Sequence, residues 1–298
     1  MLPYLLLIAV LPLTQGVRII QTNQDGWSEA NVRTFLDVLS TMGHDVLLSA
    51  PRYSYSVPPS MPNTTDCDNP PGCGDLSIDD IYGYNRTNLR LGFMNASQVR
   101  PIRNGIRHVG PRLWNQQKAE LVLAGPDIGH TLGTDQITAP SVQAVKYAAH
   151  EEKIPAISFA GATGALTSWN APTPSYSMIY AQLAENITST VVRGGKPYLP
   201  SNTYLHVNFP RVTDERCNAL SDFKFVLTRS RLGRGLHTRW CKRWGFPLET
   251  DVMRERGDEC FVTISPGHAN RQLSGPGVLA ERKIIQRLGP ILVCLPEA

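Results

Sequence analysis

The chain has 298 residues, of which 42% are hydrophobic and 18% are charged, and its formal net charge is +4. This hydrophobic content can fill a sizeable core, which excludes a wholly disordered protein. The charge density is far below that of a dedicated nucleic-acid-binding protein, and no apolar run reaches the ~20 residues of a membrane span. The composition indicates a globular protein with no nucleic-acid polymer as partner.

The N-terminus has the pattern of a cleavable secretion signal. Residues 2–13 form an apolar stretch of signal-peptide length, and the small residues Thr14 and Gly16 stand where a signal peptidase would require them. No Lys or Arg precedes this stretch, so a buried first strand or helix is the alternative. We expect residues 1–16 to be a signal peptide and residues 17–298 to form one domain of a secreted protein.

Two further features favour an oxidising, glycosylating route. Four Asn-X-Ser/Thr sequons predict glycosylation at Asn63, Asn85, Asn95 and Asn186. Six cysteines allow fifteen disulfide pairings, and only the first of the neighbouring pairs closes a short local loop. A zinc site is disfavoured because no CxxC pair with matching His spacing exists. Proximity in the sequence suggests the pairs Cys67–Cys73, Cys217–Cys241 and Cys260–Cys294.

The first two thirds of the chain alternate strand and helix patterns. Residues 17–22 form a β-branched apolar run that ends in a turn, and residues 28–42 have helical spacing with Ser28 as predicted N-cap and Gly43 as the stop. Such alternation predicts parallel strands joined by right-handed crossovers. Further strands are predicted at 45–50, 119–127 and 155–160, and further helices at 139–152 and 173–194.

Two regions depart from this alternation. Residues 52–90 are rich in Pro, Ser, Asn, Asp and Gly, and we expect a long surface loop pinned by Cys67–Cys73. The portion from about residue 200 to 298 has strand patterns at 203–209, 223–228 and 260–265 and a helix at about 276–288. The predicted fold is α/β: a doubly wound, mostly parallel, Rossmann-like sheet with a more antiparallel or extended C-terminal portion.

The residues that follow the strands are the functional candidates, because parallel sheets bind ligands at the carboxyl ends of their strands. Four motifs resemble those of the SurE family, the survival-protein nucleotidases and acid phosphatases, and in particular its secreted fungal members. The resemblance rests on the order of these motifs over residues 17–295. The motifs are Thr22-Asn23-Gln24-Asp25-Gly26, Ser49-Ala50-Pro51 with Ser56 downstream, Gly125-Pro126-Asp127-Ile128-Gly129, and Val207-Asn208-Phe209-Pro210.

This resemblance implies a SurE-like fold and metal-dependent hydrolysis of phosphomonoesters, with a small-molecule phosphate ester as substrate. The family binds Mg²⁺ or Mn²⁺ through two adjacent aspartates, a serine and an asparagine. The corresponding positions here are Gln24, Asp25, Ser56 and Asp127, so one carboxylate has moved across the site. Amide and carboxylate oxygens both suit such a hard cation, which would polarise the phosphoryl oxygen and orient water. We expect Asp25 and Asp127 to be the catalytic metal ligands, completed by Gln24 and Ser56.

Substrate contacts are expected from Asn23, His130, Thr131 and Ser141. Simpler structural interpretations exist for several of these residues. Asn23 would brace its turn through side-chain hydrogen bonds, and a lone histidine is more often structural than catalytic. The aspartates would serve only as a helix cap or turn residues.

Several substitutions weaken the phosphatase prediction. The family glycine after Ser56 is Val57, the second asparagine of the glycine loop is Thr131, and the serine before the next helix is Ala139. A β-branched residue in place of glycine adopts positive φ only at a cost. Two alternatives therefore stay open: a non-catalytic SurE-like binding protein, and an enzyme repurposed for a secondary-metabolite substrate.

Residues 229–243 contain six basic residues, Trp240 and no acidic residue. A solvated arm is the simplest interpretation, and a phosphate-attracting or subunit-contacting arm is the next. Because the family oligomerises through its C-terminal extension, the resemblance favours a homo-oligomer.

Overall fold

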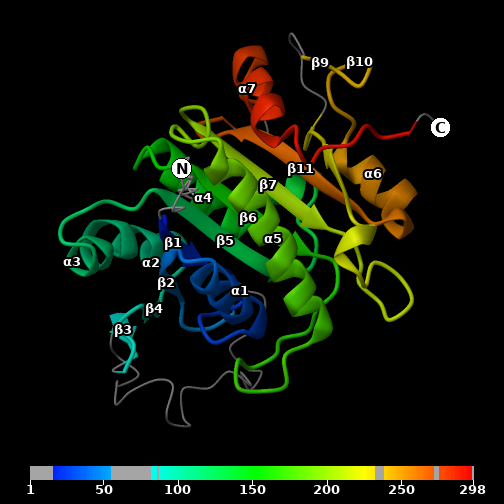
Figure 1. Ribbon diagram of the computed structural model, residues 1–298. Helices are drawn as coiled ribbons and strands as arrows, with labels where there is room; N and C mark the ends of the chain where they lie inside the picture. The colour runs from blue at the N-terminus through cyan, green and yellow to red at the C-terminus, as the bar shows by residue number, and fades with distance from the viewer. Residues whose placement is uncertain (1–15, 55–81, 86, 232–237, 272–274, 297–298) are drawn as a thin grey trace, which may run out of the picture.

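The structure is a computed structural model that describes residues 16–54, 82–85, 87–231, 238–271 and 275–296. Within these ranges a nine-stranded sheet has the order β3-β4-β2-β1-β5-β6-β7-β11-β8, and β9 and β10 form a separate hairpin (Figure 1). The strands are β1 (Arg18–Thr22), β2 (Asp45–Pro51), β3 (Tyr82–Tyr84), β4 (Leu91–Met94), β5 (Leu121–Ile128), β6 (Ala156–Gly161), β7 (Thr203–Phe209), β8 (Lys224–Leu227), β9 (Arg239–Trp240), β10 (Arg243–Trp244) and β11 (Phe261–His268).

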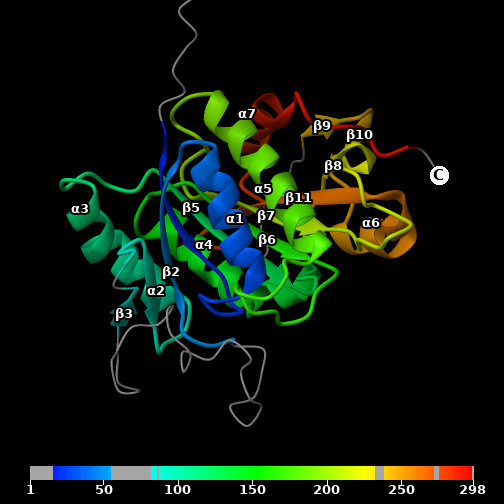
Figure 2. The same cartoon turned by 60° about the horizontal axis from the view of Figure 1, so that its bottom comes forward.

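Helices cover both faces of this sheet, as Figures 1 and 2 show. Neighbouring residues of β1 point to opposite faces: Ile19 packs in one hydrophobic cluster and Ile20 in another. The helices on the Ile19 side are α1 (Ala30–Thr41), α5 (Ser175–Arg193) and α7 (Val278–Leu288), and on the Ile20 side α2 (Val99–Asn104) and α4 (Pro140–His150). Strands buried on both faces are mostly apolar, which explains the apolar runs of the sequence.

The predicted doubly wound α/β fold is confirmed, and its strands from β4 to β7 are parallel. The antiparallel elements of the C-terminal portion are the β9–β10 hairpin and β11, and β11 pairs antiparallel with β7 and parallel with β8. Strand β11 therefore extends the main sheet instead of forming a separate layer. Strand β3 lies inside the predicted 52–90 loop, whose residues 55–81 and 86 fall outside the described ranges.

Several elements were not predicted. They are β4, α2, the π-helix Gly105–Val109, α3 (Gly110–Leu113), α6 (Glu249–Arg256) and the β9–β10 hairpin. The predicted N-cap Ser28 is also wrong: Glu29 caps α1, and its carboxylate accepts a hydrogen bond from the Asn31 amide at 2.6 Å. Gly43 follows the helix with φ of +85°, as a stop residue should.

The two disulfides of the described residues differ from the predicted pairs. Cys217 is bonded to Cys260, and Cys241 to Cys294. The first bond forms because antiparallel pairing brings the start of β11 to the end of β7, which Cys217 follows. The second forms because the C-terminal tail runs beside β8, with the Val293 amide bonded to the Phe225 carbonyl. The predicted Cys67–Cys73 pair lies outside the described residues.

The sequons differ in accessibility. Asn95 is exposed, Asn186 is half-buried on α5, and Asn85 is buried, while Asn63 lies outside the described residues. The Asn85 side-chain oxygen accepts hydrogen bonds from Thr87 and Asn88. Across the described ranges, no helix combines the length and apolarity that crossing a bilayer requires.

Candidate functional site

Two loops meet at the carboxyl edge of the sheet. Strands β1 and β5 are parallel neighbours with Thr22 opposite Ala124, so the segments that follow them lie side by side. The Asp25 Oδ2 accepts a hydrogen bond from the Ile128 amide at 2.7 Å. The Asp127 Oδ1 accepts one from the Gln24 amide at 3.0 Å. Each carboxylate is therefore held by the backbone of the opposite loop.

A bulge in β5 turns Asp127 toward its partner loop. The register between β5 and β6 shifts between Ala124 and Asp127. Gly125 has φ of +98°, and a Cβ there would lie 2.1 Å from the Phe159 carbonyl oxygen. Only glycine fits this close approach, and bulges of this kind commonly redirect a side chain beside a site.

The two aspartates form an electrostatically strained pair. Asp25 is 1% exposed and Asp127 2% exposed. Burial and then the negative charge of Asp25 raise the pKa of Asp127 well above its usual range, and hydrogen bonds from Ser141 and the Gln24 amide oppose this. Two close carboxylates with little access to water need a counter-charge or a proton.

A third carboxyl group, Glu29, was not predicted. It is fully buried, and burial followed by the charges of Asp25 and Asp127 raises its pKa to about 8. Its Oε1 atom has no hydrogen-bond partner among the described residues. The position of Glu29 directly before a helical pattern is a weak signal for a cap, but nothing local in the sequence signals its burial.

The predicted role of Asn23 as a turn brace is wrong. Its side-chain oxygen and nitrogen are both buried, and neither has a hydrogen-bond partner within the described part of the chain. Buried polar atoms are normally satisfied, so an unsatisfied amide beside two carboxylates is available to a ligand. Gln24 is half-buried beside it, and Ser56 lies outside the described residues.

The loop that follows Asp127 is clamped by β7. The Asn208 side chain accepts from the Thr131 amide at 2.9 Å and donates to the Thr131 carbonyl at 3.1 Å. The His206 Nε2 lies 2.7 Å from the same carbonyl, which can only accept, so Nε2 carries the proton. Ser158 then donates to the unprotonated Nδ1 at 2.8 Å. Burial lowers the pKa of His206 to about 4, which keeps this ring neutral.

The predicted substrate residues occupy different environments. Thr131 is buried and clamped, and Ser141, in the first turn of α4, is bonded to Asp127 and to Gln98, whose amide donates at 3.0 Å. Ser141 is therefore brought to the aspartate pair although Ala139 caps α4 without a side-chain bond. His130 is exposed, and its Nε2 donates to the Phe209 carbonyl at 2.9 Å. Desolvation, together with the charge of Arg211, lowers the pKa of His130.

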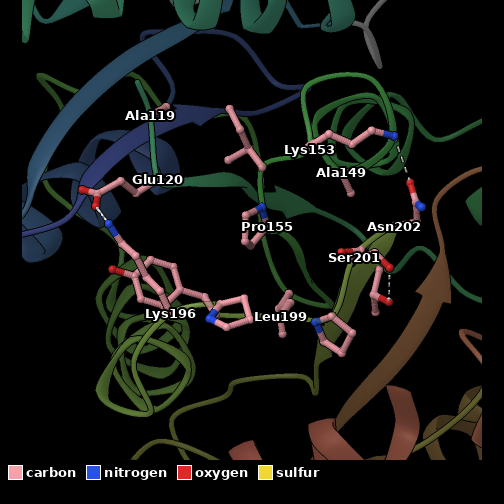
Figure 3. A pocket seen from close by; sticks show the side chains of 14 residues that line it. Ala119, Glu120, Ala149, Lys153, Pro155, Lys196, Leu199, Ser201 and Asn202 are labelled. Carbon is pink, nitrogen blue, oxygen red and sulfur yellow. Dashed lines mark hydrogen bonds and ion pairs between the residues drawn. The ribbon is translucent and has the colours of Figure 1, made fainter. Parts of the chain in front are cut away.

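A cavity of about 480 Å³ lies elsewhere, where β5, β6 and β7 begin (Figure 3). Lys196 on its rim is paired with Glu120, and Lys153 lies 3.4 Å from the Asn202 side-chain oxygen. None of the predicted site residues lines this cavity. The opposite, carboxyl edge of the sheet thus remains the candidate site.

Comparisons with known proteins identify the family of this chain. The family model described as Survival protein SurE matches residues 19–232. An acid phosphatase of Yarrowia lipolytica is 27% identical over 297 residues, covering 88% of this chain and 81% of that protein. The crystal structure of the SurE protein from Aquifex aeolicus has a TM-score of 0.55 and 17% identity, covering 91% of this chain and 99% of that chain, and this likeness concerns the fold. Because the family model matches well over half of its length, the chain belongs to the SurE family.

Proposed function

We propose that this protein is a secreted, metal-dependent phosphomonoesterase of the acid phosphatase type. Membership of the SurE family and the acid phosphatase relative support a phosphatase-type hydrolase. The observation that carries the proposal is the buried pair of Asp25 and Asp127, each oriented by the backbone of the other loop.

The donor atoms fit a hard divalent cation such as Mg²⁺ or Mn²⁺. The carboxylates of Asp25 and Asp127 and the Asn23 amide, which has no partner among the described residues, all offer oxygen ligands. Among the described residues no group of three His, Cys, Asp or Glu is placed to hold a metal, so neutral oxygens would complete the shell. Asp25, Asp127 and the Gln24 amide oxygen would hold the ion, with Ser56 as the fourth predicted ligand. When bound, such an ion supplies charge neutralisation and an activated water.

The other residues would orient the two carboxylates and bind the substrate. The amides of Gln24 and Ile128 fix the two carboxylates, which keeps both from turning toward solvent. Ser141 donates to Asp127 and is itself fixed by Gln98. His130 has committed its Nε2 proton to the Phe209 carbonyl, so its Nδ1 is left to accept a hydrogen bond from the substrate.

Secretion, glycosylation and assembly belong to the same proposal. The two disulfides fit an oxidising compartment, and the acid phosphatase relative fits an extracellular role. We propose that residues 1–16 are removed as a signal peptide, that Asn95 is the most accessible of the described sequons, and that the chain forms a homo-oligomer. N-terminal sequencing and glycan mapping of secreted protein test the first two points.

The enzymatic proposal is tested by hydrolysis of an aryl phosphate from pH 4 to 8, with and without Mn²⁺ or Mg²⁺. We expect turnover to require metal and to fall at least about a hundredfold in Asp25→Asn. Asp135→Asn is the control, because Asp135 is exposed on the same loop region. Full activity in the presence of a chelator, or in Asp25→Asn, would refute the metal-dependent mechanism.

A further inference from the structure

Arg52 stands at the candidate site but has no role in the proposal above. It directly follows β2, and its amide donates to the Met94 carbonyl at 2.7 Å. A Cβ on Gly26 would lie 3.3 to 3.5 Å from the backbone of residues 52–54. The segment of Arg52 therefore packs against the loop that carries Asp25.

Arg52 is a buried residue, and its guanidinium lies beside two aromatic rings. The residue is 5% exposed, and its Cζ lies 5.2 Å from the Tyr53 ring centre and 5.8 Å from that of Phe93. Phe93 in turn lies 4.7 Å from Trp27, two residues after Asp25. Cation–π contacts offset part of the cost of burying the charge.

This arginine has no counter-ion among the residues that the structure describes. Its Nε atom has no hydrogen-bond partner, and no carboxylate forms an ion pair with Arg52, in the ranges that the structure describes. A charged group that is nine-tenths buried is normally paired, because desolvation without a partner is costly. With no carboxylate partner within the described ranges, the guanidinium can pair with an anion.

Arg33 provides an internal comparison. Its guanidinium also lies between aromatic rings, 5.7 Å from Trp27 and 4.8 Å from Trp169. Arg33, however, lies on α1 and feels the negative charge of Asp37 on the next turn. The two arginines thus share an aromatic setting and differ in their access to a carboxylate.

We propose that Arg52 binds the phosphoryl group of the substrate at the carboxyl edge of the sheet. Two carboxylates and one divalent cation sum to no net charge, so binding a phosphate dianion there calls for a further positive group. A guanidinium presents a planar set of donors that matches phosphate oxygens. This inference rests on the proposed function for the identity of the ester, and inorganic phosphate serves as the probe.

The test measures inorganic phosphate binding by calorimetry, with Mn²⁺ present, in full-length secreted protein. Arg52→Met keeps the length of the side chain and removes its charge, and we expect phosphate affinity to fall about ten- to hundredfold. Arg33→Met is the matched control and should bind phosphate like the wild type. In turnover of an aryl phosphate, Arg52→Met should raise KM more than it lowers kcat.

A folded Arg52→Met protein with wild-type phosphate affinity would overturn the inference. If that variant does not fold, Arg52→Lys decides: a fall of at least about threefold is expected from loss of the planar fork, and unchanged affinity contradicts it. A wild type that binds phosphate through Arg52 without hydrolysing an ester would refute the proposed function alone. If the wild type hydrolyses the ester but its phosphate affinity does not depend on Arg52, this inference alone is refuted.

Discussion

Glu249 predicts a specific dependence of stability on pH. The residue lies in the first turn of α6 and is fully buried. Its Oε1 accepts from the Gly133 amide at 2.7 Å and from Gln136 at 2.5 Å, and its Oε2 accepts from Ser265 at 2.6 Å. Glu249 thus ties the loop after Asp127 to β11.

Burial raises the pKa of Glu249 from 4.5 to about 7, against the hydrogen bonds that it accepts. Because the folded protein binds this proton more tightly than the unfolded chain, the group stabilises the fold fully below pH 4.5. That contribution is lost as pH rises through about 7. The rise of this pKa from 4.5 to about 7 corresponds to about 3 kcal/mol of unfolding free energy.

The substitution Glu249→Gln removes this dependence. The glutamine oxygen can accept from Gly133 and Gln136, and its amide can donate to Ser265, which then donates to Thr228 at 2.8 Å. The variant therefore resembles the protonated wild type at every pH. We expect the unfolding free energy of the variant, measured relative to that of the wild type, to rise by about 3 kcal/mol from pH 4.5 to pH 8.

Urea unfolding of the metal-free proteins at pH 4.5, 6 and 8 measures this difference. Glu120→Gln is a control of opposite sign: burial raises the pKa of Glu120, but contacts with Lys196 and Arg18 outweigh it and lower the pKa overall. The Glu120 contribution is present above its unfolded pKa and is lost as pH falls. If the difference between Glu249→Gln and wild type is the same at pH 4.5 and 8, the reasoning is refuted.

Two other predictions concern the loop clamp and the disulfides. Asn208→Ala removes both side-chain bonds to Thr131, so we expect about 1–3 kcal/mol of lost stability by thermal unfolding and a larger relative loss of turnover. Retained turnover in a destabilised variant would show that the loop needs no clamp. Replacing Cys217 and Cys260 by serine opens a link across 43 residues and should cost about 2–4 kcal/mol in urea unfolding. Peptide mapping that links Cys217 to Cys241 instead would contradict the pairing.

The sequence predicts the parallel core well because its signals are local. The run 17–22 centres on the β-branched pair Ile19 and Ile20 and gives rise to β1, which is buried on both faces. Strand β4 escaped prediction because its four residues lie after a Pro- and Asn-rich stretch and are ordered by pairing with β2. The 99–113 helices contain Pro101, Gly105 and Gly110, and packing outweighs their low helix propensity, with Gly105 lying against Ser49.

The sequence predicts the candidate site only in part. Asp25 and Asp127 are found through motifs at strand ends, but their crossed hydrogen bonds depend on the pairing of β1 with β5. Glu29, Arg52 and Glu249 have no distinguishing local pattern, because their burial arises from contacts far apart in the chain. The same reason explains the two disulfide pairs that proximity predicted wrongly.

The exchange of charge between positions 24 and 127 is the most direct test of the proposed site. Asp127→Asn should lower Mn²⁺ affinity and aryl phosphate turnover at least about a hundredfold, because one of two carboxylate ligands is lost. The double variant Gln24→Asp with Asp127→Asn restores a second carboxylate on the opposite loop. It should recover most of the Mn²⁺ affinity and most of the turnover. Calorimetry with Mn²⁺ measures the affinity without reference to activity. Unchanged Mn²⁺ affinity and turnover in Asp127→Asn would contradict the account.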